Sequence, residues 1–113
     1  MPTYIFKILM SVFLVICIGV HVVGVVSPLT GEPLWSHIVH MISYAICLVS
    51  VLRPFSWRWV AYTIGAVYPF MYHARCAWTQ FAIFGRYSAV CILVVVLLPT
   101  GIWLVWPKGP KTD

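Results

Sequence analysis

Residues 4–26 read YIFKILMSVFLVICIGVHVVGVV, an apolar run interrupted by a single charge, Lys7, and a single histidine, His21. An α-helix rises about 1.5 Å per residue, so a run of this length covers the hydrocarbon core of a bilayer, which is about 30 Å thick. The run stops at SPLTGEP (27–33), whose prolines and glycine are typical of a loop. This stretch therefore predicts a transmembrane helix over 4–26.

Three more apolar runs follow the first. They cover about 34–52, 57–78 and 87–106, and they are separated by short polar or proline-containing segments. Pro69 and Pro99 fall inside the third and fourth runs, where transmembrane helices tolerate proline as a kink. The fold class predicted is an all-α integral membrane protein, a single domain over 1–113 built as a bundle of four transmembrane helices (about 4–26, 34–52, 57–78 and 87–106).

The composition supports a membrane protein and excludes several other classes. Of 113 residues, 63% are hydrophobic and only 8% are charged, whereas a soluble domain needs far more polar surface. The net charge of +5 comes from scattered Lys and Arg rather than a basic cluster, so we expect no nucleic-acid partner. None of the four cysteines forms a C-x-x-C pair, and no disulfide framework is indicated.

The positive charges predict an orientation. In the four-helix topology one side of the membrane receives five basic residues, and the other side receives Glu32, Arg75 and Arg86. The five are Lys7, Arg53, Arg58, Lys108 and Lys111. Because cytoplasmic loops carry an excess of Lys and Arg, we expect both termini to be cytoplasmic, in a bacterial inner membrane, with the lipid bilayer as the principal partner.

All four histidines fall in the same half of this predicted bundle. His21 lies near the end of the first helix, His37 and His40 lie in the first turns of the second, and His73 lies near the end of the third. His37, His40, Tyr44 and Cys47 are spaced three, four and three residues apart, so they share one helix face. Ionisable side chains in a membrane helix face the bundle interior, so we expect the imidazoles to converge.

A metal ion is one ligand that such a cluster predicts. Imidazole binds zinc, copper, iron and nickel, and a histidine pair three residues apart can offer two nitrogens to one ion. The candidate metal ligands are His21, His37, His40, His73 and Glu32.

A b-type haem is the other cofactor that the histidines suggest. Two helices would each supply an axial ligand from among His21, His40 and His73, and Arg75 would pair with a propionate. Small residues such as Gly24 or Gly65 would make room for the macrocycle. A haem protein of this kind would have electron transfer as its natural role. The sequence leaves open which cofactor, if either, is bound.

Non-cofactor roles remain as alternatives. Each histidine can serve packing, hydrogen-bonded to a backbone carbonyl, Ser or Tyr of a neighbouring helix. The chain would then be a non-catalytic accessory or assembly subunit of a larger membrane complex, or a homo-oligomeric channel or carrier for a small solute. There is no G-x-S-x-G motif, and Glu32 is the sole carboxylate before the C-terminal tail, which argues against a nucleophilic hydrolase. A metal-dependent hydrolase needs only three protein ligands and a water, so the sequence leaves enzymatic activity open.

Overall fold

The computed structural model describes residues 2–27, 31–86 and 88–108 and is helical throughout, with no strand in these ranges. Four long helices form the bundle, and a single-turn helix follows the last of them. They are α1 (Thr3–Val26), α2 (Leu34–Leu52), α3 (Arg58–Phe84), α4 (Ala89–Thr100) and α5 (Ile102–Val105). The predicted all-helical, four-helix arrangement is thus confirmed.

Two of the predicted helix boundaries differ from the structure. Helix α3 continues past Trp78 to Phe84, because the chain meets no helix-breaking residue before Gly85, which adopts the left-handed conformation at φ 68° and ends the helix. The fourth predicted helix, 87–106, divides into α4 and α5, and residue 87 lies outside the described residues. Helix α4 begins after Ser88, whose side chain accepts a hydrogen bond from the backbone N–H of Cys91.

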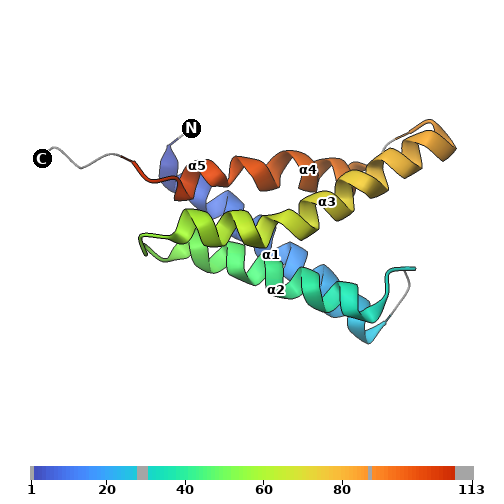
Figure 1. The fold of residues 1–113 in the computed structure, drawn as a ribbon, viewed down its shortest axis with the longest axis horizontal. Coiled ribbons are helices and arrows are strands. Elements are labelled where there is room, and N and C mark those ends of the chain that lie inside the picture. The colour runs from blue at the N-terminus through green and yellow to red at the C-terminus, as the bar shows by residue number, and fades with distance from the viewer. Residues whose placement is uncertain (1, 28–30, 87, 109–113) are drawn as a thin grey trace, which may run out of the picture.

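Proline accounts for the division of the last helix. Pro99 has no N–H to donate to the carbonyl one turn earlier. The turn after it tightens, so that the N–H of Gly101 donates to the carbonyl of Leu98, three residues back, at 3.2 Å. Helix α3 contains Pro69 and bends near its middle, away from α2 and alongside α4 (Figure 1). The kinks predicted from the two prolines fit these observations.

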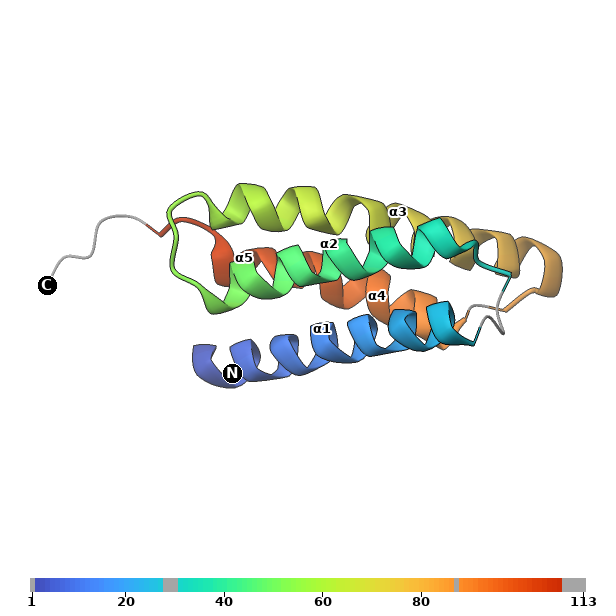
Figure 2. The same ribbon diagram turned by 90° about the horizontal axis from the view of Figure 1, so that it is seen from below.

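The helices run antiparallel along the length of the bundle (Figure 1). The start of α1, the α2–α3 connection and α5 lie at one end, called here the terminal end (Figure 1). The end of α1, the start of α2 and the end of α3 lie at the other, the histidine end. Helix α2 packs against both α1 and α3, and α3 packs against α4 and α5, while α1 lies along the outside of α2 (Figure 2).

One buried tyrosine ties α3 to the last helices. Tyr62 is fully buried, and its hydroxyl donates a hydrogen bond to the carbonyl of Leu98 at 2.5 Å. Gly101 gives the ring its room: a Cβ there would lie 2.0 Å from the Tyr62 hydroxyl oxygen and 2.9 Å from the Cε of Met10 on α1. The close approach of three helices at this point therefore requires a residue without a side chain.

The outer surface of the bundle is apolar. Helices α1 and α2 are both long and apolar enough to cross a membrane. Large apolar side chains on the outer face of α1 are well exposed, for example Ile16 at 58% and Val23 at 61%.

Gly101→Ala is expected to lower the free energy of unfolding by about 1–3 kcal/mol, because the new methyl group must displace Tyr62 from a close-packed position. Gly19→Ala is the matched control. Gly19 is a helical glycine with no heavy atom near its missing Cβ, so alanine there should be neutral or stabilising by up to about 1 kcal/mol. Unfolding by denaturing detergent in mixed micelles measures both variants. Equal stability of the two would contradict the packing described here.

Candidate metal centre

Four imidazoles and one carboxylate meet at the histidine end. His21 comes from α1, His37 and His40 from α2, His73 from α3, and Glu32 from the segment that leads into α2. All four histidines are buried, with exposed fractions from 0% for His40 to 8% for His73. The Glu32 side chain is also 8% exposed, so a carboxylate is enclosed with them. The convergence expected from the sequence is therefore present.

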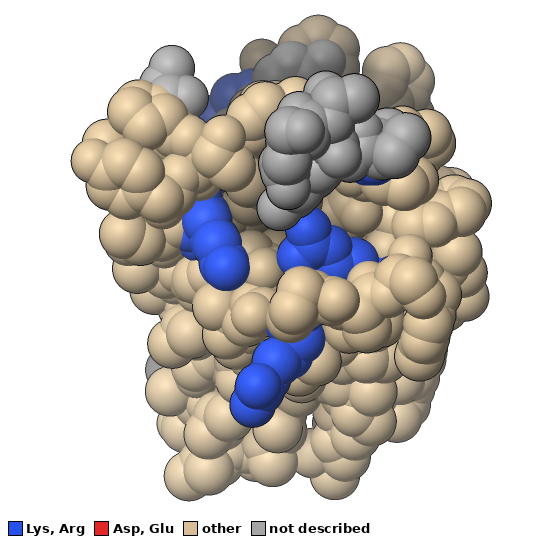
Figure 3. Space-filling view, turned by 90° about the vertical axis from the view of Figure 1, so that its left-hand side faces the viewer, with Lys and Arg blue, Asp and Glu red and all other residues tan. Residues whose placement is uncertain are grey.

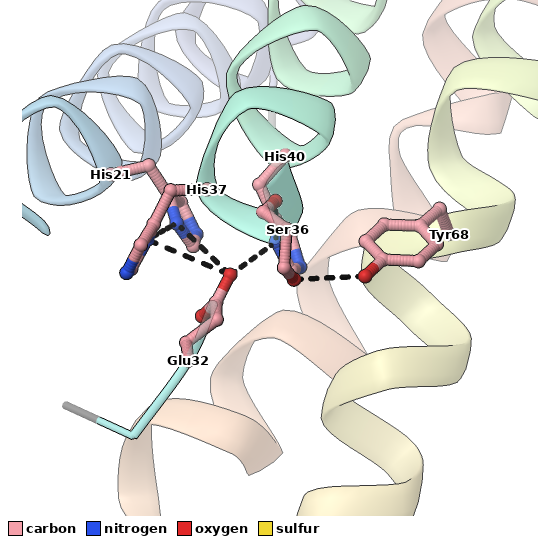
Figure 4. Close-up of polar contacts among 6 residues, drawn as sticks. All are labelled: His21, Glu32, Ser36, His37, His40 and Tyr68. Carbon is pink, nitrogen blue, oxygen red and sulfur yellow. Dashed lines mark hydrogen bonds and ion pairs between the residues drawn. The ribbon is translucent and has the colours of Figure 1, made fainter. Parts of the chain in front are cut away.

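Helical periodicity explains how α2 supplies two of these imidazoles. His37, His40, Tyr44 and Cys47 are all buried, as their spacing predicts, and they form the inward face of α2. The backbone of Pro33 is extended before the helix starts at Leu34. This geometry turns Glu32, one residue earlier, back toward the helix face, and its carboxylate points in among the histidines (Figure 4).

The Glu32 carboxylate contacts three of the histidines. Its Oε2 lies 2.9 Å from Nδ1 of His40, 3.5 Å from Nδ1 of His37 and 3.7 Å from Nδ1 of His21. This Oε2 atom has no hydrogen-bond partner among the described residues, and the Nδ1 of His40 also lies 2.9 Å from the carbonyl of Ser36. Buried carboxylates are normally paired with a cation or hydrogen-bonded.

The hydrogen bond to the Ser36 carbonyl assigns the tautomer of His40. A carbonyl only accepts, so Nδ1 of His40 carries the proton and Nε2 carries the lone pair. That Nε2 atom is buried without a hydrogen-bond partner. Metal-binding histidines commonly donate their other ring N–H to a backbone carbonyl, which fixes the ring and raises its basicity. His40 thus has the arrangement of a ligand.

Other imidazole nitrogens are also unpartnered. Both ring nitrogens of His73 and the Nε2 of His37 are buried and have no hydrogen-bond partner among the described residues. Buried polar atoms are nearly always hydrogen-bonded in folded proteins, since an unsatisfied group costs about 1–3 kcal/mol. Such a concentration of unsatisfied nitrogens at one place is a feature of ligand sites.

Two overlapping sets of three side chains have metal-binding geometry. One set is His21, His40 and His73, and the other is His21, Glu32 and His37. In each set the ligand atoms lie within 4.8 Å of one another. Nitrogens bound to one tetrahedral zinc are about 3.4 Å apart, and each imidazole binds the ion in the plane of its own ring. Because the rings of His21 and His40 are stacked with planes 5° apart, one of these two rings must turn before both reach the same ion. His21 belongs to both sets and is the common member.

Aromatic rings pack around His40. Its ring stacks on that of His21, with centroids 4.2 Å apart and planes 5° apart. The rings of Tyr68 and Tyr72 contact it edge-on at 4.9 Å and 4.8 Å. The hydroxyl of Tyr68 shares a hydrogen bond of 2.8 Å with Ser36 (Figure 4). The ring of His40 is therefore fixed on several sides.

Some residues lie in places that the sequence did not indicate. Arg75, considered for a haem propionate, is exposed and forms no hydrogen bond or ion pair within the described residues. Gly24 does not leave an open space, because a Cβ there would lie 2.4 Å from Cε1 of His37, whose ring occupies it. Gly65 is likewise in contact with α2, through Ile46, Cys47 and the carbonyl of Ser43.

Ser36 is a site residue that sequence reasoning missed. It precedes His40 by four residues, the separation at which a side chain reaches a carbonyl of its own helix. The four-residue spacing between Ser36 and His40 could therefore have predicted the contact between the His40 ring and the Ser36 carbonyl. The pairing of its hydroxyl with Tyr68 of α3 depends on tertiary packing and has no local signal in the sequence.

Comparison with family models, with curated proteins and with solved structures finds no match to this chain. Any function of this chain must therefore be inferred from the geometry of the site.

The contact between Gly24 and His37 can be tested by a double-mutant cycle. Gly24→Ala should cost about 1–3 kcal/mol of stability, because the methyl group displaces the His37 ring. In a His37→Ala background the space is vacated, and the same change should cost less than about 0.5 kcal/mol. Unfolding of chelator-treated protein in mixed micelles measures all four proteins. Additive costs would show that His37 does not occupy this space.

Proposed function

We propose that this chain is a membrane-embedded four-helix protein that binds a transition-metal ion at its histidine end. The observation that carries the proposal is the convergence of His21, His40 and His73. They come from three different helices, are buried, and bring ligand atoms within 4.8 Å of one another. Glu32 and His37 stand beside them and supply further donors.

The donor set determines the kind of ion. Three imidazoles with an adjacent carboxylate suit zinc, copper, iron or nickel, whereas magnesium and calcium prefer oxygen donors. No cysteine belongs to either set of ligands. A divalent ion would compensate the buried charge of Glu32 and would bind the lone pair at Nε2 of His40.

The packing favours a single ion over a haem. A bis-histidine haem needs its two imidazoles on opposite sides of the macrocycle. The rings of His21 and His40 stack directly at 4.2 Å, and those of His40 and His73 are in edge contact at 5.5 Å, so neither pair encloses a macrocycle. The space beside Gly24 is taken by the His37 ring. Arg75, the residue considered for a propionate, is exposed and away from these contacts.

The enclosure of the site favours a structural ion. Catalytic metal sites keep an open coordination position that a substrate can reach, whereas structural sites are closed by protein ligands. Each imidazole here is at most 8% exposed. An ion bound by His21, His40 and His73 would cross-link α1, α2 and α3. This matters most for α1, which packs chiefly against α2.

The apolar exterior supports the membrane part of the proposal. Helices α1 and α2 have the length and hydropathy of spanning helices, and large apolar side chains cover the outside of α1. If α1 and α2 cross the membrane, the histidines near the end of α1 and at the start of α2 lie toward the same face of the membrane. By the distribution of Lys and Arg this face is the non-cytoplasmic one.

Metal titration of the purified protein tests the proposal. We expect one zinc or copper ion per chain after removal of adventitious metal, measured by calorimetry and elemental analysis. His40→Ala and His73→Ala should each weaken binding by at least about 100-fold, since removing even an outer-shell partner costs 10–100-fold. Bound zinc should also raise the unfolding midpoint of the wild type but not of His40→Ala.

Cys91→Ala is the matched control, because it removes a potential metal ligand that belongs to neither set. It should bind metal as the wild type does. Absence of stoichiometric binding, or equal loss in the control, would refute the site. A Soret band in protein expressed with adequate haem would refute a single-ion centre in favour of haem.

A further inference from the structure

A second feature lies at the terminal end, far from the histidines. A cavity of about 500 Å³ opens between the start of α1, the α2–α3 connection and the end of α5. Three basic side chains line it, namely those of Lys7, Arg58 and Lys108. Figure 3 views this end and shows Lys and Arg side chains gathered on a face where no Asp or Glu is visible among the described residues. We call this the basic cavity.

No described carboxylate balances these charges. Glu32 is the sole Asp or Glu in the ranges 2–27, 31–86 and 88–108, and it is buried at the opposite end among the histidines. Lys7 and Lys108 are exposed, and Arg58 is half-buried. Like charges gathered around one cavity repel one another, so the arrangement is best satisfied when an anion lies between them.

Arg58 is held in place at the cavity. Its guanidinium donates to the carbonyl of Leu104 at 3.2 Å and to that of Arg53 at 3.4 Å. A guanidinium has five N–H donors in a fixed fork, so donors remain for a ligand after these two bonds. Lys108 is held by a cation–π contact, with its Nζ 4.3 Å from the centroid of the Trp103 ring. The cations are therefore partly pre-positioned.

The rest of the lining is apolar. Val51, Leu104 and Val105 are buried beneath the cavity, and Phe55 and Trp106 flank it. A free phosphate ion has no apolar part that could pack against these apolar walls. A phospholipid presents a charged phosphate next to apolar chains, and basic pockets between helices on the cytoplasmic side are where anionic headgroups bind.

We infer that the basic cavity binds the phosphate of an anionic phospholipid, with Lys7, Arg58 and Lys108 around the headgroup and the apolar walls against the start of its chains. The inference rests on the proposed membrane location and not on the metal. It assigns the terminal end to the leaflet that carries anionic lipid, which agrees with the orientation predicted from the basic residues.

Native mass spectrometry of the detergent-solubilised protein tests the cavity. Phosphatidylglycerol is titrated against phosphatidylcholine, and we expect the anionic lipid to be retained preferentially. Lys7→Gln with Lys108→Gln should weaken its binding roughly 25-fold, because each basic residue near the surface contributes about a factor of five. This variant leaves Arg58 and its two carbonyl contacts intact.

Arg75→Gln with Arg86→Gln is the control, since it removes the same charge from exposed positions outside the cavity. It should retain phosphatidylglycerol as the wild type does. Equal weakening in both double variants would show a general charge effect and overturn the cavity. Displacement of the lipid by millimolar inorganic phosphate would reveal an anion site without lipid specificity and would overturn the assignment to lipid.

The same preparation separates this inference from the proposed function. Protein that stays in the aqueous fraction without detergent would refute the membrane location, and with it the lipid site. Protein that requires detergent but retains neither lipid preferentially would refute the basic cavity alone. The metal content of the same sample tests the proposed metal site separately, because it does not depend on solubility or on lipid retention.

Discussion

The burial of Glu32 among imidazoles is the constraint on which the histidine end depends. A carboxylate that is 8% exposed, with three imidazole nitrogens within 3.7 Å, requires a compensating positive charge or hydrogen-bond donors. The three imidazoles come from α1 and from two positions on α2, so the same cluster joins the end of α1 to the start of α2. The proposed metal ion would compensate the charge and bind unpartnered imidazole nitrogens at the same time. Protonation of one imidazole would satisfy the charge alone.

Periodic features of the site could be predicted from the sequence. The face formed by His37, His40, Tyr44 and Cys47 follows from helical spacing, and all four side chains are buried. The helix bounds of α1 and α2 follow from the apolar runs and the prolines that flank them. These features depend on residues close together in the chain, where local physics is sufficient.

Features set by packing between helices could not be predicted. The missing side chain of Gly24 suggests room for a macrocycle, yet the ring of His37 from the neighbouring helix lies there. The partner of the Ser36 hydroxyl is Tyr68, 32 residues away. Bilayer thickness also gave no basis for the extension of α3 to Phe84, because a helix ends where its backbone is interrupted, here at Gly85, and not where the apolar stretch stops.

The two ends of the bundle differ in how their charged side chains are arranged. The one described carboxylate is enclosed at the histidine end, while Lys7, Arg58 and Lys108 surround a cavity at the terminal end. The proposed metal site and the proposed lipid site would lie at opposite ends of the bundle, as they would in a small protein that holds one orientation across a bilayer. In the core between the two ends, Tyr62 of α3 packs against Gly101, and this is where α1, α3 and the last helices meet.

X-ray absorption spectroscopy of the zinc-loaded protein tests the central claim most directly, because it counts the ligands of the bound ion. We expect three imidazoles, with nitrogen or oxygen donors at about 2.0–2.1 Å and no sulfur among the ligands. A sulfur contribution at about 2.3 Å, or fewer than three imidazoles per zinc, would contradict the assignment of His21, His40 and His73 as the metal ligands.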